Sequence, residues 1–283
     1  MDLVPASQFT YEELTHAYNQ TRVDYLVPMP MNVARLKEYC RVYDVDLDNS
    51  VVVVDWENEN LIYGLGMLGV RGNRGWITRL GVLPFGRRMG IGSQLMDGLV
   101  ANAIRLRLGQ IWLEVIKNNE PAHRMFRRYG FVETRELVVA RRAPTPQDTP
   151  GGENRVKRVT PLNHEDAIIL LSHRRGQPNW LIQTQSMQNV HNLSGLLVEL
   201  RDGGRGWVTY HAGLLQLTRI VVEVTAGDPA GVTEAVLNVL HQRYKRQDAI
   251  VENICDDAQW VGFQRAGYFE SFRRIEMVKE LSP

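Results

Sequence analysis

The segment with the clearest chemical character is residues 80–93, where an apolar strand pattern passes into a helix pattern. Glycines at a helix start let backbone N–H groups approach an anion, and the helix dipole adds partial positive charge there. Two arginines add full charges, so the segment predicts a pyrophosphate site; a tight turn with solvated arginines is the alternative. Its residues are Leu80, Gly81, Val82, Leu83, Pro84, Phe85, Gly86, Arg87, Arg88, Met89, Gly90, Ile91, Gly92 and Ser93.

The spacing excludes two common phosphate-binding motifs. A nucleoside-triphosphatase loop needs Gly-Lys-Ser/Thr, and a dinucleotide fold needs a third glycine with an acidic ribose ligand, and the sequence has neither. Residues 85–142 nevertheless hold eleven Lys or Arg against five Asp or Glu. This local positive excess favours an anionic ligand, although the whole chain carries a net charge of only +1.

A second informative segment, residues 113–131, lies one predicted helix and one predicted strand further along the chain. It opens on the apolar strand Leu113 to Ile116. This segment resembles the second conserved block of the GNAT superfamily of acetyl-CoA-dependent N-acetyltransferases, and Arg87-x-x-Gly90-x-Gly92 resembles the first block. The two blocks stand at the family's spacing, and by element order the resemblance covers residues 8–142.

The resemblance implies acetyl-CoA as co-substrate and no metal. The backbone of residues 80–82 would pair with pantetheine, and one N–H would polarise the thioester carbonyl, an oxyanion-type role. An ordinary core strand is the alternative, yet both hold together because side chains pack while the backbone binds. The residues expected to bind the cofactor are Leu80, Gly81, Val82, Arg87, Arg88, Met89, Gly90, Ile91, Gly92, Ser93, Asn119 and Phe126.

The sequence departs from the family at the general acid. Members often have a tyrosine that protonates the leaving thiolate where this chain has Phe126. Either Tyr129 or water then supplies the proton, or no acid is needed because a thiolate of pKa ~8.5 leaves tolerably well. Glu114 matches a position that some members use as the base, and an ion pair with a neighbouring arginine is an equal alternative.

The acceptor side carries fewer signals. Tyr25 and the loop Pro28 to Pro30 lie where the family closes over the acceptor. Tyr25, Met29 and Trp76 would build an apolar or aromatic acceptor pocket, and packing of the first two helices explains them nearly as well. The resemblance implies a primary amine of a small molecule or peptide as acceptor, without identifying it.

The elements that position these residues follow from hydrophobic periodicity and helix-end signals. Thr10 with Glu13 forms a capping-box pattern that opens the first helix, and one apolar stripe predicts a helix from Gly90 to Leu106. The first half is therefore predicted as ααβββαβαβ, an α+β fold around one mixed sheet. The other predicted elements are a helix at 31–43, strands at 51–56, 61–71, 76–83, 111–116 and 131–140, and a helix at 121–129.

The second half repeats the end of the first. Residues 143–154 are rich in proline and glycine and predict a linker, so we expect domains at 1–142 and 155–283. Residues 126–134 align with residues 263–271. We therefore predict two GNAT-like domains, each a mixed, mostly antiparallel sheet flanked by helices. The repeated elements are a helix opened by Asp228 and Pro229, a strand at 249–255, a helix at 258–265 and a strand at 268–278.

The repeat lacks the anion loop of the first half. Its strand-to-helix turn, Thr225 to Gly231, has no arginine, and Asp228 would repel pyrophosphate. Pro229 also removes one backbone amide from the turn. The second domain is thus predicted to be degenerate and kept for packing, for dimerisation, or as one wall of the acceptor site.

Composition sets the class of protein. Apolar residues make up 44% and charged residues 23%, which is typical of soluble globular chains. A net charge of +1 gives no field for a nucleic-acid or membrane-surface binder, and no apolar run approaches the ~18 residues of a membrane helix. Two cysteines and seven histidines show no metal-ligand spacing. We expect a cytoplasmic protein without a metal, and a homodimer as one use of the repeat.

Two functions follow as hypotheses. The first is an N-acetyltransferase that moves an acetyl group from acetyl-CoA to a primary amine by direct attack in a ternary complex, with one coenzyme A per chain. The second is a non-catalytic acyl-CoA-binding sensor or regulatory scaffold, which the absence of the family tyrosine favours.

Overall fold

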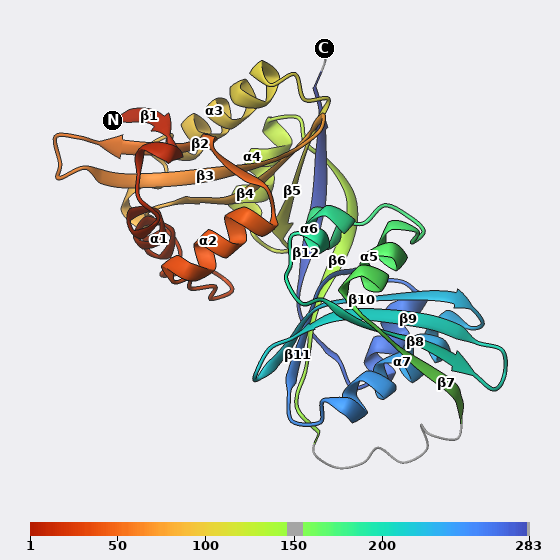
Figure 1. The fold of residues 1–283 in the computed structure, drawn as a ribbon. Helices are drawn as coiled ribbons and strands as arrows, with labels where there is room; N and C mark the ends of the chain where they lie inside the picture. Colours follow the sequence, from red (N-terminus) through yellow and green to blue (C-terminus); the bar gives the residue numbers. More distant parts are fainter. Residues whose placement is uncertain (146–154, 282–283) are drawn as a thin grey trace. The chain divides into compact units, whose positions relative to one another are not determined.

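The computed structural model describes residues 1–145 and 155–281, and their contacts divide the chain into two compact units. Unit 1 comprises Met1–Thr134 and Ile275–Pro283, and unit 2 comprises Arg135–Arg274 (Figure 1). The strands β6 (Val132–Arg142) and β12 (Phe269–Glu280) therefore give residues to both units. The predicted linker lies mostly outside the described residues, and the domain boundaries at 142 and 155 stay predictions.

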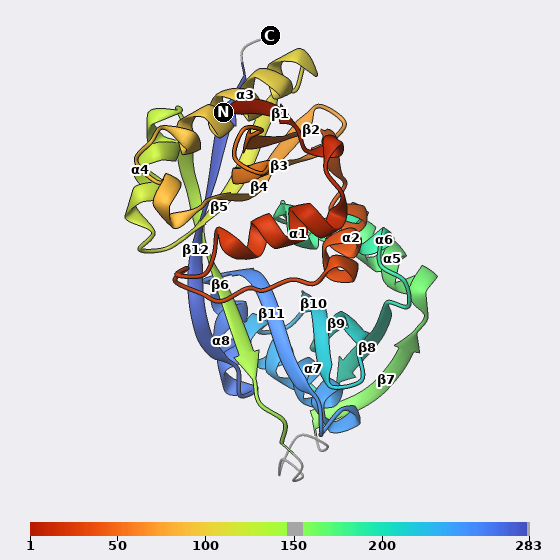
Figure 2. The same ribbon diagram turned by 90° about the vertical axis from the view of Figure 1, so that its left-hand side faces the viewer.

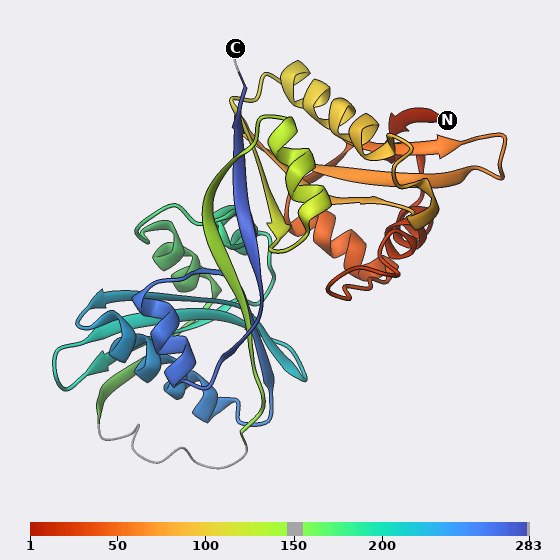
Figure 3. The same cartoon turned by 180° about the vertical axis from the view of Figure 1, so that it is seen from behind.

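Unit 1 is a mixed sheet with helices on both faces. Strands β1 to β4 pair antiparallel in order, and β5 pairs parallel with β4. Helices α1 and α2 cover one face, and α3 and α4 cover the other (Figure 3). Its elements are β1 (Asp2–Pro5), α1 (Tyr11–Gln20), α2 (Val33–Val42), β2 (Val45–Asp55), β3 (Leu61–Arg71), β4 (Arg74–Val82), the 3-10 helix η2 (Pro84–Gly86), α3 (Ile91–Arg105), β5 (Gln110–Ile116) and α4 (Glu120–Arg128).

Local signals account for the helices of unit 1. Thr10 accepts from the Glu13 backbone N–H at 3.2 Å and the Glu13 carboxylate accepts from the Thr10 N–H at 2.7 Å, so the predicted capping box is present. Most of the predicted stripe of α3 is buried against the sheet, with α1 on the opposite side (Figure 2), whereas Ile104, which we also assigned to the stripe, is 56% exposed. The same core contains Met277 and Leu281 from the end of the chain.

Unit 2 has the same arrangement. Strand β10 pairs antiparallel with β9 and parallel with β11. Helices α7 and α8 pack on one face and α5 and α6 on the other. Its elements are β7 (Val156–Leu162), α5 (His164–Ser172), the 3-10 helix η4 (Trp180–Ile182), α6 (Thr184–Gln188), β8 (Ser194–Leu200), β9 (Arg205–Ala212), β10 (Gln216–Ala226), α7 (Pro229–Arg243), β11 (Asp248–Cys255) and α8 (Ala258–Arg265).

The predicted α+β class is confirmed, and each unit has mixed strand pairing flanked by helices. In the described residues the strands are hydrogen-bonded in the order β1-β2-β3-β4-β5-β12-β6-β11-β10-β9-β8-β7, so they form one twelve-stranded sheet and not the two separate sheets that we expected. Strand β1 is an addition that the sequence pattern did not predict, because its four residues are too few to show a period. Within the described residues, none of the helices has the length and apolarity needed to cross a membrane.

Candidate functional site

The predicted cofactor strand lies where two parallel strands of unit 1 separate. The ladder between β4 and β5 runs from the Arg74–Gln110 pair to the Ile77–Leu113 pair. Beyond it, β4 has a bulge opposite β3, and Arg79 adopts a left-handed backbone conformation with φ +52°. Residues 80–82 therefore lie beyond the last residue pair of the β4–β5 ladder, as a strand must if its backbone is to pair with a ligand.

Gly81 has a second, structural role. A Cβ at this position would lie 2.5 Å from the Thr21 hydroxyl oxygen, so only glycine lets the end of α1 pack directly on β4. This packing brings the residues that follow α1 next to Leu80. The cofactor strand and the predicted acceptor loop are thereby in contact within unit 1.

The glycine loop ends in a helix N-terminus that has no side-chain cap. Gly90 is the N-cap of α3 with φ +85°, and a Cβ there would meet nothing within 4 Å. Because the first backbone N–H groups of a helix lack intrahelical partners, this end can receive an anion. Met89 is 54% exposed beside it, and Gly92 lies under the Met125 sulfur, with an ideal Cβ 3.4 Å away.

The two arginines of the loop differ in their surroundings. Arg87 forms a two-pronged ion pair with Asp24, at 2.6 and 2.7 Å, and this pair lowers the pKa of the Asp24 carboxyl. Arg88 is exposed and makes no hydrogen bond or ion pair within the residues that the structure describes. In this structure Arg87 thus holds the loop after α1, and Arg88 is the arginine available to an anion.

Asn119 and Phe126 have structural contacts. The Asn119 side chain caps α4 by accepting from the Ala122 N–H at 3.4 Å. Phe126 is buried and packs edge-on against Phe131, with ring centroids 6.1 Å apart. Both lie on α4, whose N-terminus follows the separated end of β5. Their contact with a cofactor stays a prediction.

Glu114 lies on the face of β5 that α1 and α2 cover. One carboxylate oxygen accepts from the Trp76 indole N–H at 2.8 Å. Trp76 is buried and packs against Tyr39 and Tyr43 of the α2 segment. Glu114 is therefore held on the predicted acceptor side, whereas Trp76 is part of the packing beneath it.

The Tyr129 hydroxyl is directed at α3. It lies 2.7 Å from the Asp97 carboxylate and 2.9 Å from the Ser93 carbonyl oxygen. Burial, and then the hydrogen bond to Asp97, raise the pKa of Tyr129. These contacts tie α4 to α3 and make the phenol a weaker proton donor.

The acceptor loop contains a cluster that the sequence reading missed. Arg22 lies over the rings of Tyr18 and Tyr25, with its guanidinium carbon 4.7 and 4.6 Å from the ring centroids. Arg79 lies 4.1 Å from the Tyr39 ring centroid and donates to the Tyr18 hydroxyl at 2.9 Å. The Tyr18 hydroxyl in turn donates to the Met29 carbonyl oxygen at 3.0 Å.

One sequence signal could have located Arg79. Residues 77–82, Ile-Thr-Arg-Leu-Gly-Val, recur at 217–222 as Leu-Thr-Arg-Ile-Val-Val. Both arginines lie at a bulge and have positive φ, +52° for Arg79 and +54° for Arg219. The recurrence marks the strand position at which each unit's parallel pair separates.

In unit 2 the corresponding space is filled by the protein itself. The Asp228 carboxylate caps α7 and accepts from the Gly231 N–H at 2.7 Å. The Gln259 amide of α8 donates to the carbonyl oxygen of Val222, the counterpart of Val82, at 3.1 Å. Helix α8 also packs against α7 at Gly262, where a Cβ would lie 2.5 Å from the Ala230 carbonyl oxygen.

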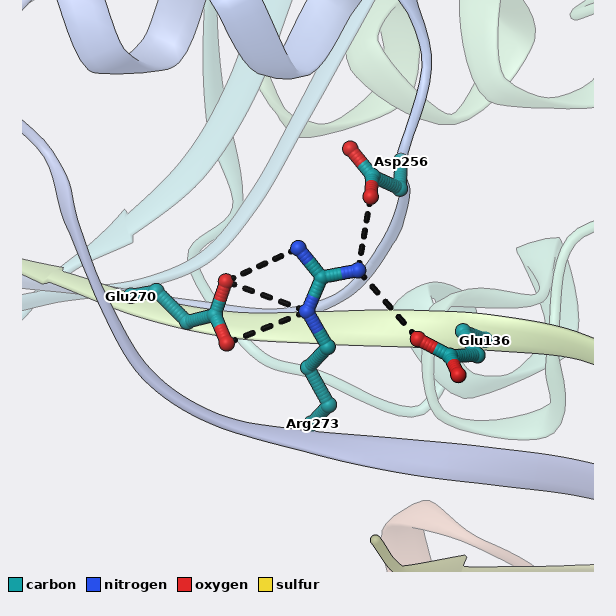
Figure 4. Close-up of polar contacts among 4 residues, drawn as sticks. All are labelled: Glu136, Asp256, Glu270 and Arg273. Atoms are coloured by element: carbon teal, nitrogen blue, oxygen red, sulfur yellow. Dashed lines mark hydrogen bonds and ion pairs between the residues drawn. The ribbon is translucent and has the colours of Figure 1, made fainter.

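The start of α8 is also acidic. Arg273 is surrounded by three carboxylates, Glu270 at 2.9 Å, Asp256 at 2.6 Å and Glu136 at 3.3 Å (Figure 4). Asp256 aligns with Asn119 of unit 1. The excess of negative charge disfavours a diphosphate at this position of unit 2.

No group of three or more His, Cys, Asp or Glu side chains with metal-binding geometry occurs among residues 1–145 and 155–281.

The sequence matches the acetyltransferase (GNAT) family over residues 11–131. A GCN5-related N-acetyltransferase from Sphaerobacter thermophilus has a similar structure, with a TM-score of 0.71, 17% identity, and coverage of 100% of this chain and 96% of that one. No protein with a curated description matches the sequence.

Two further solved structures resemble the chain over nearly its whole length. A tandem GNAT protein from the clavulanic acid biosynthesis pathway has a TM-score of 0.66 and 14% identity, with 100% of this chain and 99% of that chain covered. A glucosamine N-acetyltransferase region of a fungal multi-domain β-N-acetylglucosaminidase has a TM-score of 0.69 and 14% identity, with 98% and 38% covered. Identities this low establish the fold alone: residues 11–131 match the GNAT acetyltransferase family, and the whole chain has a fold similar to that of the tandem GNAT protein.

Proposed function

We propose that unit 1 is an N-acetyltransferase that moves an acetyl group from acetyl-CoA to a primary amine. The observation that carries the proposal is the juxtaposition, at the end of one strand, of two features. Residues 80–82 lie beyond the ladder with β5, and the uncapped N-terminus of α3 follows them across one short loop. A ligand with an extended amide-bearing arm and a diphosphate suits this pair.

Coenzyme A fits the residues present. Its pantetheine would pair with the backbone of residues 80–82, and its pyrophosphate would accept from the first amides of α3. Arg88 would add a full positive charge. Arg87 contributes to the diphosphate only if it leaves Asp24, with which it is now paired.

The chemistry is a direct displacement. The acceptor nitrogen forms a bond to the thioester carbonyl carbon, and the bond from that carbon to sulfur breaks, which gives an acetamide and the coenzyme A thiolate. A backbone N–H of residues 80–82 would stabilise the oxyanion between these steps. Glu114, directly or through water, would take the ammonium proton, and solvent would protonate the thiolate because Tyr129 is committed to Asp97.

A second candidate is an acyl-CoA sensor that binds the cofactor without turnover. Buried Phe126 and the raised pKa of Tyr129 favour it, because neither supplies a ready proton for a leaving thiolate. The sensor uses the same cofactor site, so binding alone does not separate the two candidates.

Thiol release from acetyl-CoA across a panel of amines separates them. The proposed enzyme releases thiol in step with amide formation for at least one acceptor. Coenzyme A binding without release for any amine supports the sensor. The double variant Arg88→Ala with Gly90→Ala should weaken coenzyme A binding by about ten- to a hundredfold, because charged hydrogen bonds contribute about 1.5 to 3 kcal/mol. An unchanged dissociation constant would overturn the cofactor assignment.

A further inference from the structure

Arg22 contacts the strand segment on which the thioester would lie. Its Nη2 donates to the Leu80 carbonyl oxygen at 3.2 Å. Leu80 belongs to the segment that the proposed function assigns to the reacting carbonyl. Arg22 follows α1 directly, and the contact of Thr21 with Gly81 fixes the approach of that segment to β4.

The Arg22 guanidinium is oriented before any ligand arrives. Its guanidinium carbon lies over the rings of Tyr18 and Tyr25, 4.7 and 4.6 Å from their centroids. Stacking on rings leaves the N–H edge of a guanidinium as its hydrogen-bonding surface. One N–H of that edge already donates to the Leu80 carbonyl oxygen. This bond and the two tyrosine rings together orient the remaining N–H donors.

Arg22 lacks the partner that a half-buried cation normally has. Its Nε is buried without a hydrogen-bond acceptor, and no carboxylate forms an ion pair with it in the described part of the chain. The nearby Asp24 is bound to Arg87. A partly desolvated cation without a carboxylate partner is costly, and an anionic group of a ligand at the accessible part of the guanidinium would offset this cost.

A carboxylate faces the same region from β5. Glu114 is held by the Trp76 indole on the sheet face that α1 and α2 cover. The predicted acceptor side therefore presents Arg22 on the loop after α1 and Glu114 on β5, together with Arg79 of β4, whose guanidinium lies over the Tyr39 ring and donates to the Tyr18 hydroxyl. An acceptor with one charge of each sign complements Arg22 and Glu114.

We propose that Arg22 binds an anionic group of the acceptor, which is therefore an amine bearing a carboxylate or phosphate close to its amino group. The inference rests on the proposed function of unit 1. Arg22 holds the anion beside Leu80, and the amino group lies toward Glu114 and the thioester. Amino acids and amino-alkyl phosphates are the two sources of this chemistry.

Matched acceptors test the role of the anion. Thiol release is measured at saturating acetyl-CoA for an amino acid, its amide and its decarboxylated amine, and for phosphoethanolamine against ethanolamine. We expect the anionic member of at least one set to have a kcat/KM at least tenfold higher, mostly through KM. Which of the two acceptor sets shows the preference reveals whether Arg22 binds a carboxylate or a phosphate.

Variants then assign the preference to Arg22. Arg22→Gln should remove the preference while rates with the uncharged amines stay within a few-fold, and Arg22→Lys should keep part of it. Arg35→Gln, at an exposed arginine at the start of α2, is the matched control and should change nothing. Coenzyme A binding by Arg22→Gln, measured by calorimetry, verifies that the variant folds.

The outcomes separate this inference from the proposed function. Turnover without any preference for anionic amines overturns the role of Arg22 and leaves the acetyltransferase intact. Absence of turnover with every amine overturns the proposed function. In that case, calorimetry of the same acceptor sets with coenzyme A present still decides, because binding of anionic amines that Arg22→Gln abolishes supports the anion site, and equal binding overturns it.

Discussion

Unit 1 and unit 2 both carry a strand with a Thr-Arg bulge, a parallel neighbour that separates from it, and a 15-residue helix after it. They differ in what meets the start of that helix. In unit 1 the N-cap is Gly90, which has no side chain, and in unit 2 it is Asp228, whose carboxylate takes the Gly231 amide at 2.7 Å. One unit offers its first-turn amides, and the other satisfies them internally.

The helices next to this site repeat the contrast. In unit 2, Gly262 lets α8 approach the α7 backbone, and Gln259 bonds the β10 backbone. In unit 1 the aligned residues are Met125 and Ala122, and Tyr129 bridges to α3 through its hydroxyl. The corresponding end of unit 2 is thus filled by the protein's own polar groups, although the strands and helices around it are the same.

The largest expected effect comes from moving the cap of unit 2 into unit 1. Gly90→Asp should abolish coenzyme A binding, with at least a thousandfold rise in Kd by calorimetry. A carboxylate about 4 Å from a phosphate charge costs about 4 kcal/mol at an effective dielectric constant of 20, and it also takes the amides. Binding at the wild-type Kd would show that the α3 terminus does not hold the diphosphate.

The control for this substitution is Gly72→Asp. Gly72 lies in the hairpin turn between β3 and β4, has φ +56° and has open space around its Cα. Gly72 therefore has a left-handed backbone and an exposed position like those of Gly90, but it does not lie at the proposed coenzyme A site. Its coenzyme A affinity should equal that of the wild type, and the titration should give one coenzyme A per chain in both proteins, since unit 2 binds none.

The next effect is on stability and concerns unit 2 alone. His241 is buried in α7 beside the Tyr268 hydroxyl at 3.0 Å, and burial, then the charge of Arg142, lower its pKa from 6.5 to about 3. Between these pH values the unfolded chain binds a proton that the folded unit does not. Unit 2 should lose roughly 1.4 kcal/mol per pH unit as pH falls through this window, on the order of 5 kcal/mol in total.

Unit 1 has Ala103 at the aligned position of α3, so α3 should stay folded to a lower pH than α7. Hydrogen exchange measured by mass spectrometry from pH 7 to pH 4 should show α7 losing protection before α3. His241→Gln should flatten the pH dependence, and His16→Gln, at an exposed histidine, should not. Equal acid sensitivity of α3 and α7 would contradict this account.

A smaller effect tests the filling of the space between the separated strands. Ala122→Gln places in unit 1 the side chain that Gln259 has in unit 2, and it should weaken coenzyme A binding about tenfold, roughly 1.4 kcal/mol, by competing for the β4 backbone. The reciprocal control, Gln259→Ala, should leave both affinity and stoichiometry unchanged. If Gln259→Ala bound a second coenzyme A, the Gln259 side chain would be the one group that prevents unit 2 from binding the cofactor.

Elements whose signals are local were predictable. The capping box of α1, the stripe of α3 and the span of α8 follow from neighbours in sequence, and the structure has each of them. The place of the last strand was not predictable in this way. Its end joins the core of unit 1, where Glu280 accepts from Gln110 at 2.8 Å, and no local pattern relates residues so far apart in sequence.

The backbone positions of the candidate site were predictable from the sequence. The partners of its side chains were less predictable. The motif spacing marked Gly90 and residues 80–82, and the structure places them together at the open end of β4. Nothing in the spacing indicated that Arg87 turns to Asp24 while Arg88 stays exposed. Arg22 carried no signal, because its setting depends on two tyrosine rings and a strand that meet only in the fold.

The smallest expected effect concerns Tyr129, whose counterpart in unit 2 is Ala266. If the hydroxyl only spaces α4 from α3, Tyr129→Phe should change kcat less than about threefold and leave the alkaline limb of the pH–rate profile in place. If it is the general acid, the loss should reach about a hundredfold or more. Tyr244→Phe, which removes a hydroxyl bonded to Tyr210 in unit 2, is the control and should leave kcat unchanged. Because Asp97 binds the Tyr129 hydroxyl at 2.7 Å and contributes to its raised pKa, we expect the small change, with protonation of the thiolate left to solvent.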